Sequence, residues 1–428
     1  MMAPISAQEA SSPLQLDLEG AIALALEHNY DVRVARADRE VQQLLADPGN
    51  AGLLPSFYLD GSAEWLLQNT DITFANIEQP PISAEGARTL NYTAAAVVEY
   101  TLFNGGRRIA SMRLLESQSD DARLREKLAM ESTVLNVGNS YLEALRMQDI
   151  SAIAQEAVEL SLERLERARE NYRYGGFTRL QLLNAEVDLR SDSIALEEAL
   201  ISAARAKRQL QLAMGIRSDS LPELEESFSF REMIDRDELL QKAEMRNTAF
   251  LRARNELYRA ERELDQSKAD RYPNLAAVGG YRYAFSDFEA NFLNTQENIG
   301  WNAGVNLRFF VFDAGRIRRN IQSAQLGIQM ARVEEERSLN EMYTRIANAW
   351  DAYISSRQLL AMSERQLELA EQNFERSKEA FAGGQVTGTE QREAQVNLSR
   401  SRNEISARRI DAKLAEMDLL FEAGALLE

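Results

Sequence analysis

The chain has 428 residues, a net charge of −18 and 27% charged residues, enough chain for two or three ordinary domains. This acidic balance, without a sizeable basic patch, argues against nucleic acid as a partner. The chain has no cysteine and one histidine, His28, which excludes a disulfide framework, a cysteine nucleophile and a multi-histidine metal site. No GxGxxG, Walker or HExxH motif occurs. We therefore expect neither an enzyme nor a bound cofactor or metal.

Residues 1–15 are predicted to be an N-terminal extension. They lack the charged and apolar regions of a signal peptide. Two interpretations are open: Met1 and Met2 are a start placed before an already processed chain, or this is the plain N-terminus of a cytosolic protein. No apolar run reaches the length of about 18 residues that predicts a transmembrane helix.

Residues 16–215 are predicted to form the first of two structural repeats. Residues 16–46 have the apolar spacing of an amphipathic helix. After Pro55, apolar and polar residues alternate over 56–68 and 91–103, which predicts a hairpin of two strands. Strands of about 10 to 13 residues can cross a bilayer when tilted. The alternative is one half of a sheet in a soluble protein.

A very long helix is predicted over 106–172, because apolar residues recur there every seven positions. At about 1.5 Å per residue it would measure on the order of 100 Å. A return helix over 178–214 begins with a capping box of Thr178 and Gln181. The turn from the hairpin into the long helix is predicted at Gly105, Gly106 and Arg107.

Residues 235–428 repeat this pattern after a linker over 216–234. The predicted elements of the second repeat are a helix over 235–270, strands over 274–286 and 299–312, a turn at Gly315 and Arg316, a long helix over 315–381 and a return helix over 387–423. Matching residues lie 218 positions apart up to Pro55 and 209 apart from Phe103 onward. The heptads combine large and small residues, which implies left-handed supercoiling. The fold is therefore predicted to be mainly α with a small β part, a two-fold repeat of long coiled-coil helices and β-hairpins.

Several segments resemble the TolC family of outer-membrane channels, and the resemblance extends over nearly the whole chain. These segments are the strand entries 54–57 and 272–275, the strand exits 102–107 and 311–316, and the helix reversals with their return helices, 172–185 and 384–395. The resemblance implies a homotrimer in which three chains form one 12-stranded β-barrel on an α-helical barrel. A four-stranded sheet has two open edges, which a lipid bilayer does not tolerate, so closure by three copies is also expected on physical grounds.

The resemblance also implies a function. It predicts a passive exit duct in the outer membrane of a Gram-negative-type bacterium, projecting into the periplasm and serving tripartite efflux or type I secretion. The implied partners are a periplasmic adaptor (membrane fusion) protein and an inner-membrane transporter. The rival hypothesis is a soluble periplasmic or cytosolic coiled-coil scaffold or adaptor.

The resemblance places an acidic periplasmic aperture on the second return helix. Its candidates are Glu390 and Glu393, which share a helix face, with Phe381 in place of a tyrosine and Gln181 where the first repeat departs from the acidic pattern. The alternatives are that Glu390 belongs to the capping box and that Glu393 is a solvated charge. A second departure is the polar run 390–393, where the family has apolar residues. Adaptor docking is predicted at the reversals, on Arg173, Tyr174, Gly175, Gly176, Phe177, Gly383, Gly384 and Val386.

Overall fold

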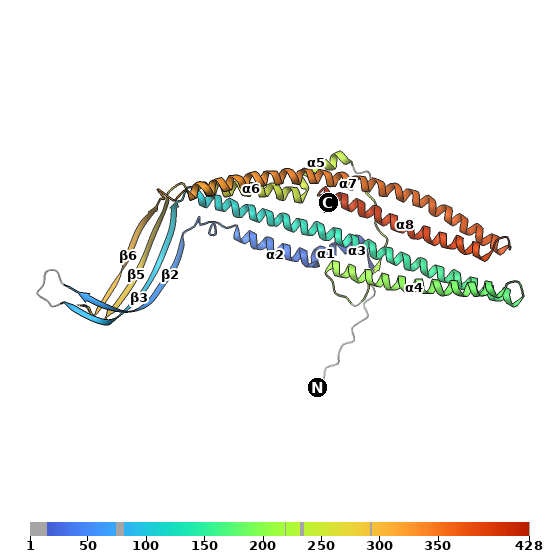
Figure 1. The fold of residues 1–428 in the computed structure, drawn as a ribbon, viewed down its shortest axis with the longest axis horizontal. Helices are drawn as coiled ribbons and strands as arrows, with labels where there is room; N and C mark the ends of the chain where they lie inside the picture. Colours follow the sequence, from blue (N-terminus) through green and yellow to red (C-terminus); the bar gives the residue numbers. More distant parts are fainter. Residues whose placement is uncertain (1–14, 74–80, 219, 232–234, 292, 428) are drawn as a thin grey trace, which may run out of the picture. The chain divides into compact units, whose positions relative to one another are not determined.

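The computed structural model describes residues 15–73, 81–218, 220–231, 235–291 and 293–427. The predicted extension lies outside these residues except for Gln15, as do parts of the first hairpin loop and of the linker. The chain is mainly helical, as predicted. In chain order the elements are β1 (Gln15–Leu16), α1 (Leu18–His28), α2 (Tyr30–Leu45), β2 (Ser56–Ile72), β3 (Ile82–Phe103), α3 (Arg107–Arg173), α4 (Arg179–Met214), β4 (Glu223–Leu224), α5 (Arg236–Arg246), α6 (Thr248–Ala269), β5 (Asn274–Phe288), β6 (Thr295–Arg308), α7 (Arg316–Ala382) and α8 (Gly388–Glu422) (Figure 1).

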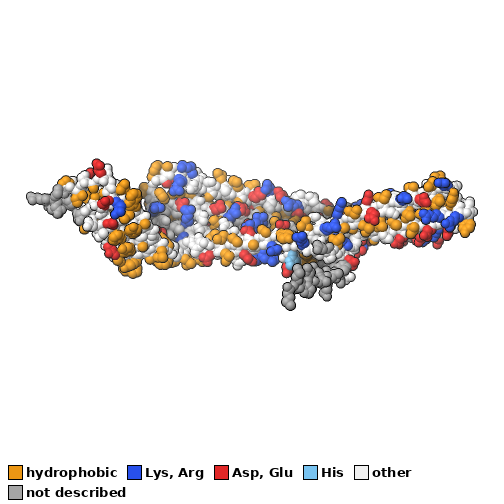
Figure 2. Space-filling model, turned by 90° about the horizontal axis from the view of Figure 1, so that it is seen from below, with side chains coloured by type: hydrophobic (Ala, Val, Ile, Leu, Met, Phe, Trp, Pro, Cys, Tyr) orange, Lys and Arg blue, Asp and Glu red, His pale blue; other side chains and the backbone are white. Residues whose placement is uncertain are grey.

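The two predicted hairpins join in one antiparallel sheet of the order β2-β3-β5-β6. Phe57 lies opposite Val98, and Tyr281 lies opposite both Ala96 and Trp301. Directly opposite residues project from the same side of a sheet. The apolar positions of all four strands therefore share one face, as the alternation predicted. Among the described residues no segment covers that face, since Trp301 is 84% exposed, and hydrophobic side chains gather over the sheet in Figure 2.

The strand ends differ from the prediction. The pairing of β2 with β3 continues to Ile72 opposite Ile82, so residues between the two predicted strands extend the hairpin, because ladder hydrogen bonds join backbones whatever the side chains. By contrast, β6 ends at Arg308 and not at 312. Arg308 pairs with Asn274, the first residue of β5, so the residues beyond it have no partner strand on that side.

The long helices α3 and α7 each have 67 residues, and the return helices α4 and α8 have 36 and 35. Among the described residues, none of the helices combines the length and the apolar character required to cross a membrane.

The prediction of one continuous helix over 16–46 is wrong in one respect: Asn29 divides the segment into the two helices α1 and α2. The backbone of Asn29 is extended, with φ −59° and ψ 136°. Its Oδ1 accepts from the backbone N–H of Asp31 at 2.8 Å and caps the start of α2. Its Nδ2 donates to the carbonyl of Ala213 at 2.8 Å. The end of α4 therefore meets the start of α2.

Asn247 divides the second predicted helix, 235–270, into α5 and α6 in the same way. Its Oδ1 accepts from Phe250 N at 2.9 Å, and its Nδ2 donates to the carbonyl of Glu422 at 2.8 Å. A glycine follows each return helix at these junctions. A Cβ on Gly215 would lie 2.5 Å from His28 O, and one on Gly424 would lie 2.5 Å from Arg246 O. The two junctions thus need both the asparagine and the glycine.

The chain divides into two compact units that cut across the sequence repeats. One unit comprises Met1–Arg39, Ala122–Ala253 and Glu335–Glu428, and the other comprises Glu40–Asp121 and Arg254–Glu334. Each unit takes segments from both repeats. The reason is that the first hairpin pairs with the second hairpin, and the first helix pair packs on the second, so the contacts join equivalent parts of the two repeats.

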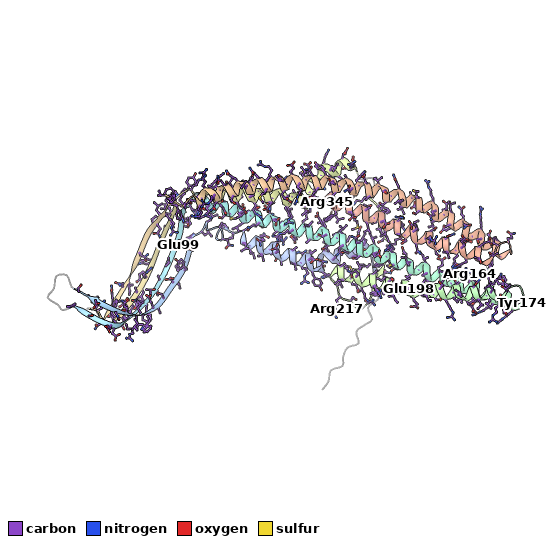
Figure 3. All side chains as sticks on the ribbon, viewed as in Figure 1. Glu99, Arg164, Tyr174, Glu198, Arg217 and Arg345 are labelled. Carbon is purple, nitrogen blue, oxygen red and sulfur yellow. The ribbon has the colours of Figure 1, made fainter. Side chains whose placement is uncertain are left out.

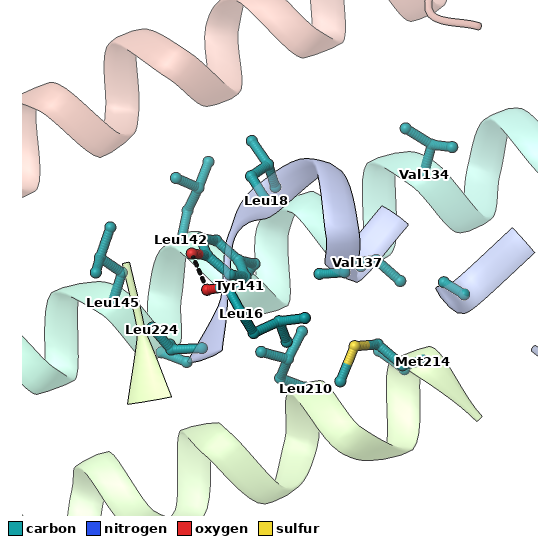
Figure 4. Close-up of a cluster of buried hydrophobic side chains, with 14 of the residues drawn as sticks. Leu16, Leu18, Val134, Val137, Tyr141, Leu142, Leu145, Leu210, Met214 and Leu224 are labelled. Atoms are coloured by element: carbon teal, nitrogen blue, oxygen red, sulfur yellow. Dashed lines mark hydrogen bonds between the residues drawn. The ribbon is translucent and has the colours of Figure 1, made fainter. Parts of the chain in front are cut away.

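The main core of the first unit lies where α1 and α4 pack on α3, around side chains such as Leu142, Leu210 and Met214 (Figure 4). The buried Tyr141 hydroxyl lies 2.8 Å from Leu16 O and 2.7 Å from Glu225 O and donates to these carbonyls. Burial, followed by the nearby charge of Asp17, raises the pKa of Tyr141 to about 12. The hydroxyl thus holds the paired strands β1 and β4 against α3 in its neutral form.

Candidate functional site

Both return helices begin with a capping box of the same geometry. In α8, Thr387 N donates to Glu390 Oε2 at 2.7 Å, and Glu390 N donates to Thr387 Oγ1 at 3.3 Å. In α4, Thr178 and Gln181 make the same two hydrogen bonds at 2.7 and 3.3 Å. The backbone hydrogen bond from Thr387, and then that from its hydroxyl, lower the pKa of Glu390. The capping role considered for Glu390 is therefore its observed role within the chain.

Of the other aperture candidates, two lie close to this cap and one belongs to the cap of α4. Glu393 is exposed and lies one turn beyond Glu390 on α8. Phe381 is half-buried in the last turn of α7, and a Cβ on Gly388 would lie 3.7 Å from its ring. Gln181 holds the equivalent cap in the first repeat. The two carboxylates of one chain thus remain open to solvent at the reversal.

The docking candidates form the two reversals. Gly175 and Gly384 have φ values of 81° and 71°, which favour glycine, whereas Gly176 and Gly383 have no positive φ. Tyr174 is 90% exposed at the tip of the α3–α4 reversal (Figure 3). Around these turns, Arg173 is exposed, and the equivalent residues Phe177 and Val386 are half-buried.

The turns between the sheet and the long helices also involve the predicted residues. Gly105 has a φ of 66°, and a Cβ there would lie 2.6 Å from Ala269 O. Arg107 forms an ion pair with Asp270. In the second repeat, Gly315 has a φ of 78°. The Arg316 guanidinium lies 5.5 Å from the centre of the Phe310 ring. These residues fix the direction of each long helix as it leaves the sheet.

The structure reveals a polar cluster that the sequence reading did not identify. Arg392 on α8 donates to both oxygens of Asp192 on α4, at 2.7 and 2.6 Å. Asp192 also accepts from the hydroxyl of Ser161 on α3. Arg164 donates to the Ser161 oxygen at 2.9 Å, and Asp188 lies 3.9 Å from both arginines. We call these five residues the tip clamp, because they join three helices near the reversals.

The charges of the tip clamp are strongly coupled. Burial acts to lower the pKa of Arg392, but the hydrogen bonds and negative charge of Asp192 outweigh it, so the pKa is raised. Burial and then repulsion from Arg392 lower the pKa of Arg164 (labelled in Figure 3). The one sequence feature that pointed toward the tip clamp was the polar run 390–393, which was interpreted as a departure from the family pattern. Nothing in that run specifies a partner 200 residues away.

Comparison with solved structures supports the fold. The Campylobacter jejuni CmeC outer membrane channel has a TM-score of 0.79 at 17% identity, covering 99% of this chain and 91% of that chain. A structure of CusC has a TM-score of 0.76 at 18% identity, covering 98% of this chain and 95% of that chain.

Comparison with known sequences points the same way. The protein CyaE of Bordetella pertussis is 24% identical over 318 residues, 73% of this chain, and the chain spans 64% of the length of that relative. The proteases secretion protein PrtF of Dickeya chrysanthemi is 20% identical over 96% of this chain and 89% of its own length. The family model described as outer membrane efflux protein matches residues 21–216 and 239–425, nearly the whole of both repeats. The chain therefore belongs to the outer membrane efflux protein family.

Proposed function

We propose that three copies of the chain form a passive exit duct across the outer membrane and periplasm, serving tripartite efflux or type I secretion. The observation that supports this most directly is the single apolar face shared by all four strands. The strands have 17, 22, 15 and 14 residues, longer than the 9 to 11 or so needed to cross a bilayer at a tilt. Family membership supports the same function.

The edges of the sheet require more than one copy. β2 and β6 each have one neighbour among the described strands, so each leaves a row of backbone groups unpaired. Unpaired backbone groups in lipid cost several kcal/mol each, which only closure of the sheet avoids. Three copies give twelve strands and a barrel wide enough for a lumen.

The experiment is expression with a signal peptide, followed by fractionation and recording in a planar bilayer. We expect recovery from the outer membrane as a detergent-dependent trimer that forms a conducting pore. A detergent-independent monomer in the soluble fraction would instead establish the rival scaffold function.

The reversals are the proposed docking surface for the adaptor, which in turn would connect the duct to an inner-membrane transporter. Their glycines leave the backbone accessible to a partner hairpin, and Tyr174 is fully presented to solvent. Combined substitution of Arg173, Phe177 and Val386 should impair export while leaving the trimer yield unchanged. Export at the normal rate in this triple variant would exclude the reversals as the docking surface.

The aperture is proposed to be lined by Glu390 and Glu393. Three copies would bring together six carboxylates, and crowded carboxylates attract cations. The pore should therefore be cation-selective and blocked by trivalent cations from the periplasmic side. Glu390→Gln combined with Glu393→Gln should abolish the block without loss of trimer. The cap should survive, because Gln181 already makes the same hydrogen bonds in the first repeat. Undiminished block in the double variant would remove both residues from the aperture.

A further inference from the structure

The four strands meet the helices at one end of the sheet. Phe103, the last residue of β3, lies opposite Leu275 near the start of β5. Asn274, the first residue of β5, lies opposite Arg308, the last residue of β6. The connections to α3, α6 and α7 therefore all leave from this end, which we call the helical end of the sheet (Figure 1). In the proposed duct it is the end that faces the periplasm.

Basic side chains gather at the helical end. Five of them come from the end of α6, the connection to β5 and the start of α7, and all five are exposed. We call these residues the basic patch: Lys268, Arg271, Arg316, Arg318 and Arg319. None of the five forms an ion pair with a carboxylate among the residues that the structure describes. The patch is thus a positive surface on a chain whose net charge is −18.

The carboxylates nearest to the basic patch in the sequence already have partners. Asp270 forms an ion pair with Arg107. Asp265 accepts a hydrogen bond from Arg262 at 2.9 Å. Asp313 accepts from two backbone N–H groups at the start of α7, at 3.0 and 2.7 Å. These contacts leave the positive charge of the patch directed toward a partner outside the chain.

The arginines of α7 also stand where a helix favours anions. The N-terminus of a helix carries a partial positive charge, so acidic side chains stabilise the first turn and basic ones do not. The first turns of α1, α5 and α8 contain acidic residues, whereas the first turn of α7 has none and three of its first four residues are arginines. This arrangement weakens the helix start within the chain. An external anion would make both the arginines and the helix dipole favourable.

Exposed apolar residues lie beside the basic patch. Val311 and Phe312, between β6 and α7, are 90% and 86% exposed, and Tyr272, before β5, is 57% exposed. The Arg316 guanidinium lies 5.5 Å from the centre of the Phe310 ring. Aromatic residues at the end of a membrane strand are typical of the boundary between hydrocarbon and lipid headgroups. The basic patch therefore lies at the depth of the headgroups if the sheet crosses a bilayer.

We propose that the basic patch binds the anionic headgroups of phospholipids in the leaflet at the helical end of the sheet. In the proposed duct, on which this inference rests, that leaflet is the periplasmic one. Arginine suits this role, because its planar guanidinium can donate two parallel hydrogen bonds to a phosphate group. Basic residues next to a membrane segment favour anionic lipid by about fivefold per residue. The apolar residues set the depth of the sheet, and the arginines select the lipid.

The test measures which lipid lies beside the patch. Because the natural chain has no cysteine, Phe312→Cys allows one fluorophore to be attached at the helical end. Thr295→Cys, at the first residue of β6, allows one at the opposite end of the sheet. Each labelled protein is reconstituted in vesicles of phosphatidylcholine and phosphatidylglycerol. The nitroxide quencher is carried either by the zwitterionic lipid or, at the same mole fraction, by the anionic one.

We expect the anionic lipid to quench the label at position 312 at least about fivefold more effectively than the zwitterionic lipid. The two lipids should quench the label at position 295 equally. Raising the salt concentration from 0.1 to 1 M should reduce the preference at position 312, because salt screens exposed charges.

Removal of the α7 arginines should abolish the preference. The variant combines Arg316→Gln, Arg318→Gln and Arg319→Gln, and it should fold, because glutamine is a good helix former and no longer opposes the helix dipole. The matched control removes three exposed arginines from the rest of α7, with the same change in net charge: Arg332→Gln, Arg365→Gln and Arg376→Gln. The control should keep the full preference for the anionic lipid.

The possible outcomes separate the lipid site from the duct. Equal quenching by the two lipids at position 312 of the otherwise natural chain would overturn the lipid site and leave the membrane-spanning sheet intact. A preference that survives loss of the α7 arginines, or that the control variant loses to the same degree, would refute the assignment to the basic patch. Absence of quenching by either lipid at both positions would refute insertion into a bilayer, and the headgroup site with it.

Discussion

Replacement of Arg392 by leucine tests the tip clamp directly, because leucine is the residue that the first repeat has at the equivalent position, Leu183. The side chains of Arg392 and Asp192 are only 21% and 12% exposed. Removing one partner of such a buried pair typically costs about 3 to 5 kcal/mol, since the other charge is left desolvated. Asp192 would keep the Ser161 hydroxyl, and Arg164 lies nearby. We therefore expect a value near the lower limit, about 3 kcal/mol.

The double variant Arg392→Leu with Asp192→Ser is the matched control, because it places at both positions the uncharged residues that lie 209 positions away in the other repeat, Leu183 and Ser401. Replacing both members of a buried ion pair is often nearly neutral. The double variant should therefore recover most of the stability that the single variant loses. A single variant that is much less stable than the double variant is the specific signature of a buried, uncompensated carboxylate.

The assay is amide hydrogen exchange of the folded protein, read at the first turns of α8 and over the adjoining segments of α3 and α4. Local opening free energies determine these exchange rates. A loss of about 3 kcal/mol corresponds to exchange that is on the order of 100-fold faster, at about 1.4 kcal/mol per tenfold change. Exchange in the sheet should remain unchanged. Equal exchange at the reversals in the natural chain, the single variant and the double variant would refute the argument that the clamp holds the helix pairs together.

Three further predictions follow from the other sites. Val305→Arg, on the apolar face three residues before the end of β6, should destabilise the membrane-inserted protein by about 1 to 2 kcal/mol, between the interfacial and the midplane cost of an arginine that faces lipid, whereas Asn306→Arg on the opposite face should fold and change conductance. Comparable stability of the two variants in denaturant titrations would reverse the assignment of faces. The folded pKa of Glu390 is lowered, so its contribution to the α8 cap is fully present above the unfolded value of about 4.3 and is lost as the pH falls through the lower folded value. Exchange at the start of α8 should therefore rise in acid relative to that at the α4 cap, where Gln181 does not titrate, and parallel behaviour would contradict this assignment. Asn29→Ala removes both the α2 cap and the hydrogen bond to Ala213 O and should lower the unfolding free energy by about 1 to 3 kcal/mol, an effect that an unchanged denaturation midpoint would disprove.

The sequence by itself determined the kinds of elements and their order. The alternation of Phe57 and Leu59 with polar neighbours, and the heptads from Leu339 to Phe381, are local patterns. Such patterns follow from backbone geometry, with a period of two in strands and about 3.5 in supercoiled helices. The capping boxes at Thr178 and Thr387 are equally local. The duplication then made each weak pattern stronger, because it occurs twice in the same order.

Only the tertiary structure decided where elements end and which charges meet. β6 stops at Arg308 because its partner strand begins at Asn274, and Asn29 interrupts a helix because it also binds the carbonyl of Ala213. Arg392 is one charge in a polar run until the fold brings Asp192 from another helix beside it. Local periodicity specifies which face of an element is apolar, but not which distant residue that face will meet. The clamp, the helix junctions and the strand ends therefore depend on contacts between segments far apart in the chain, and those of the clamp exist only once the two repeats have packed together.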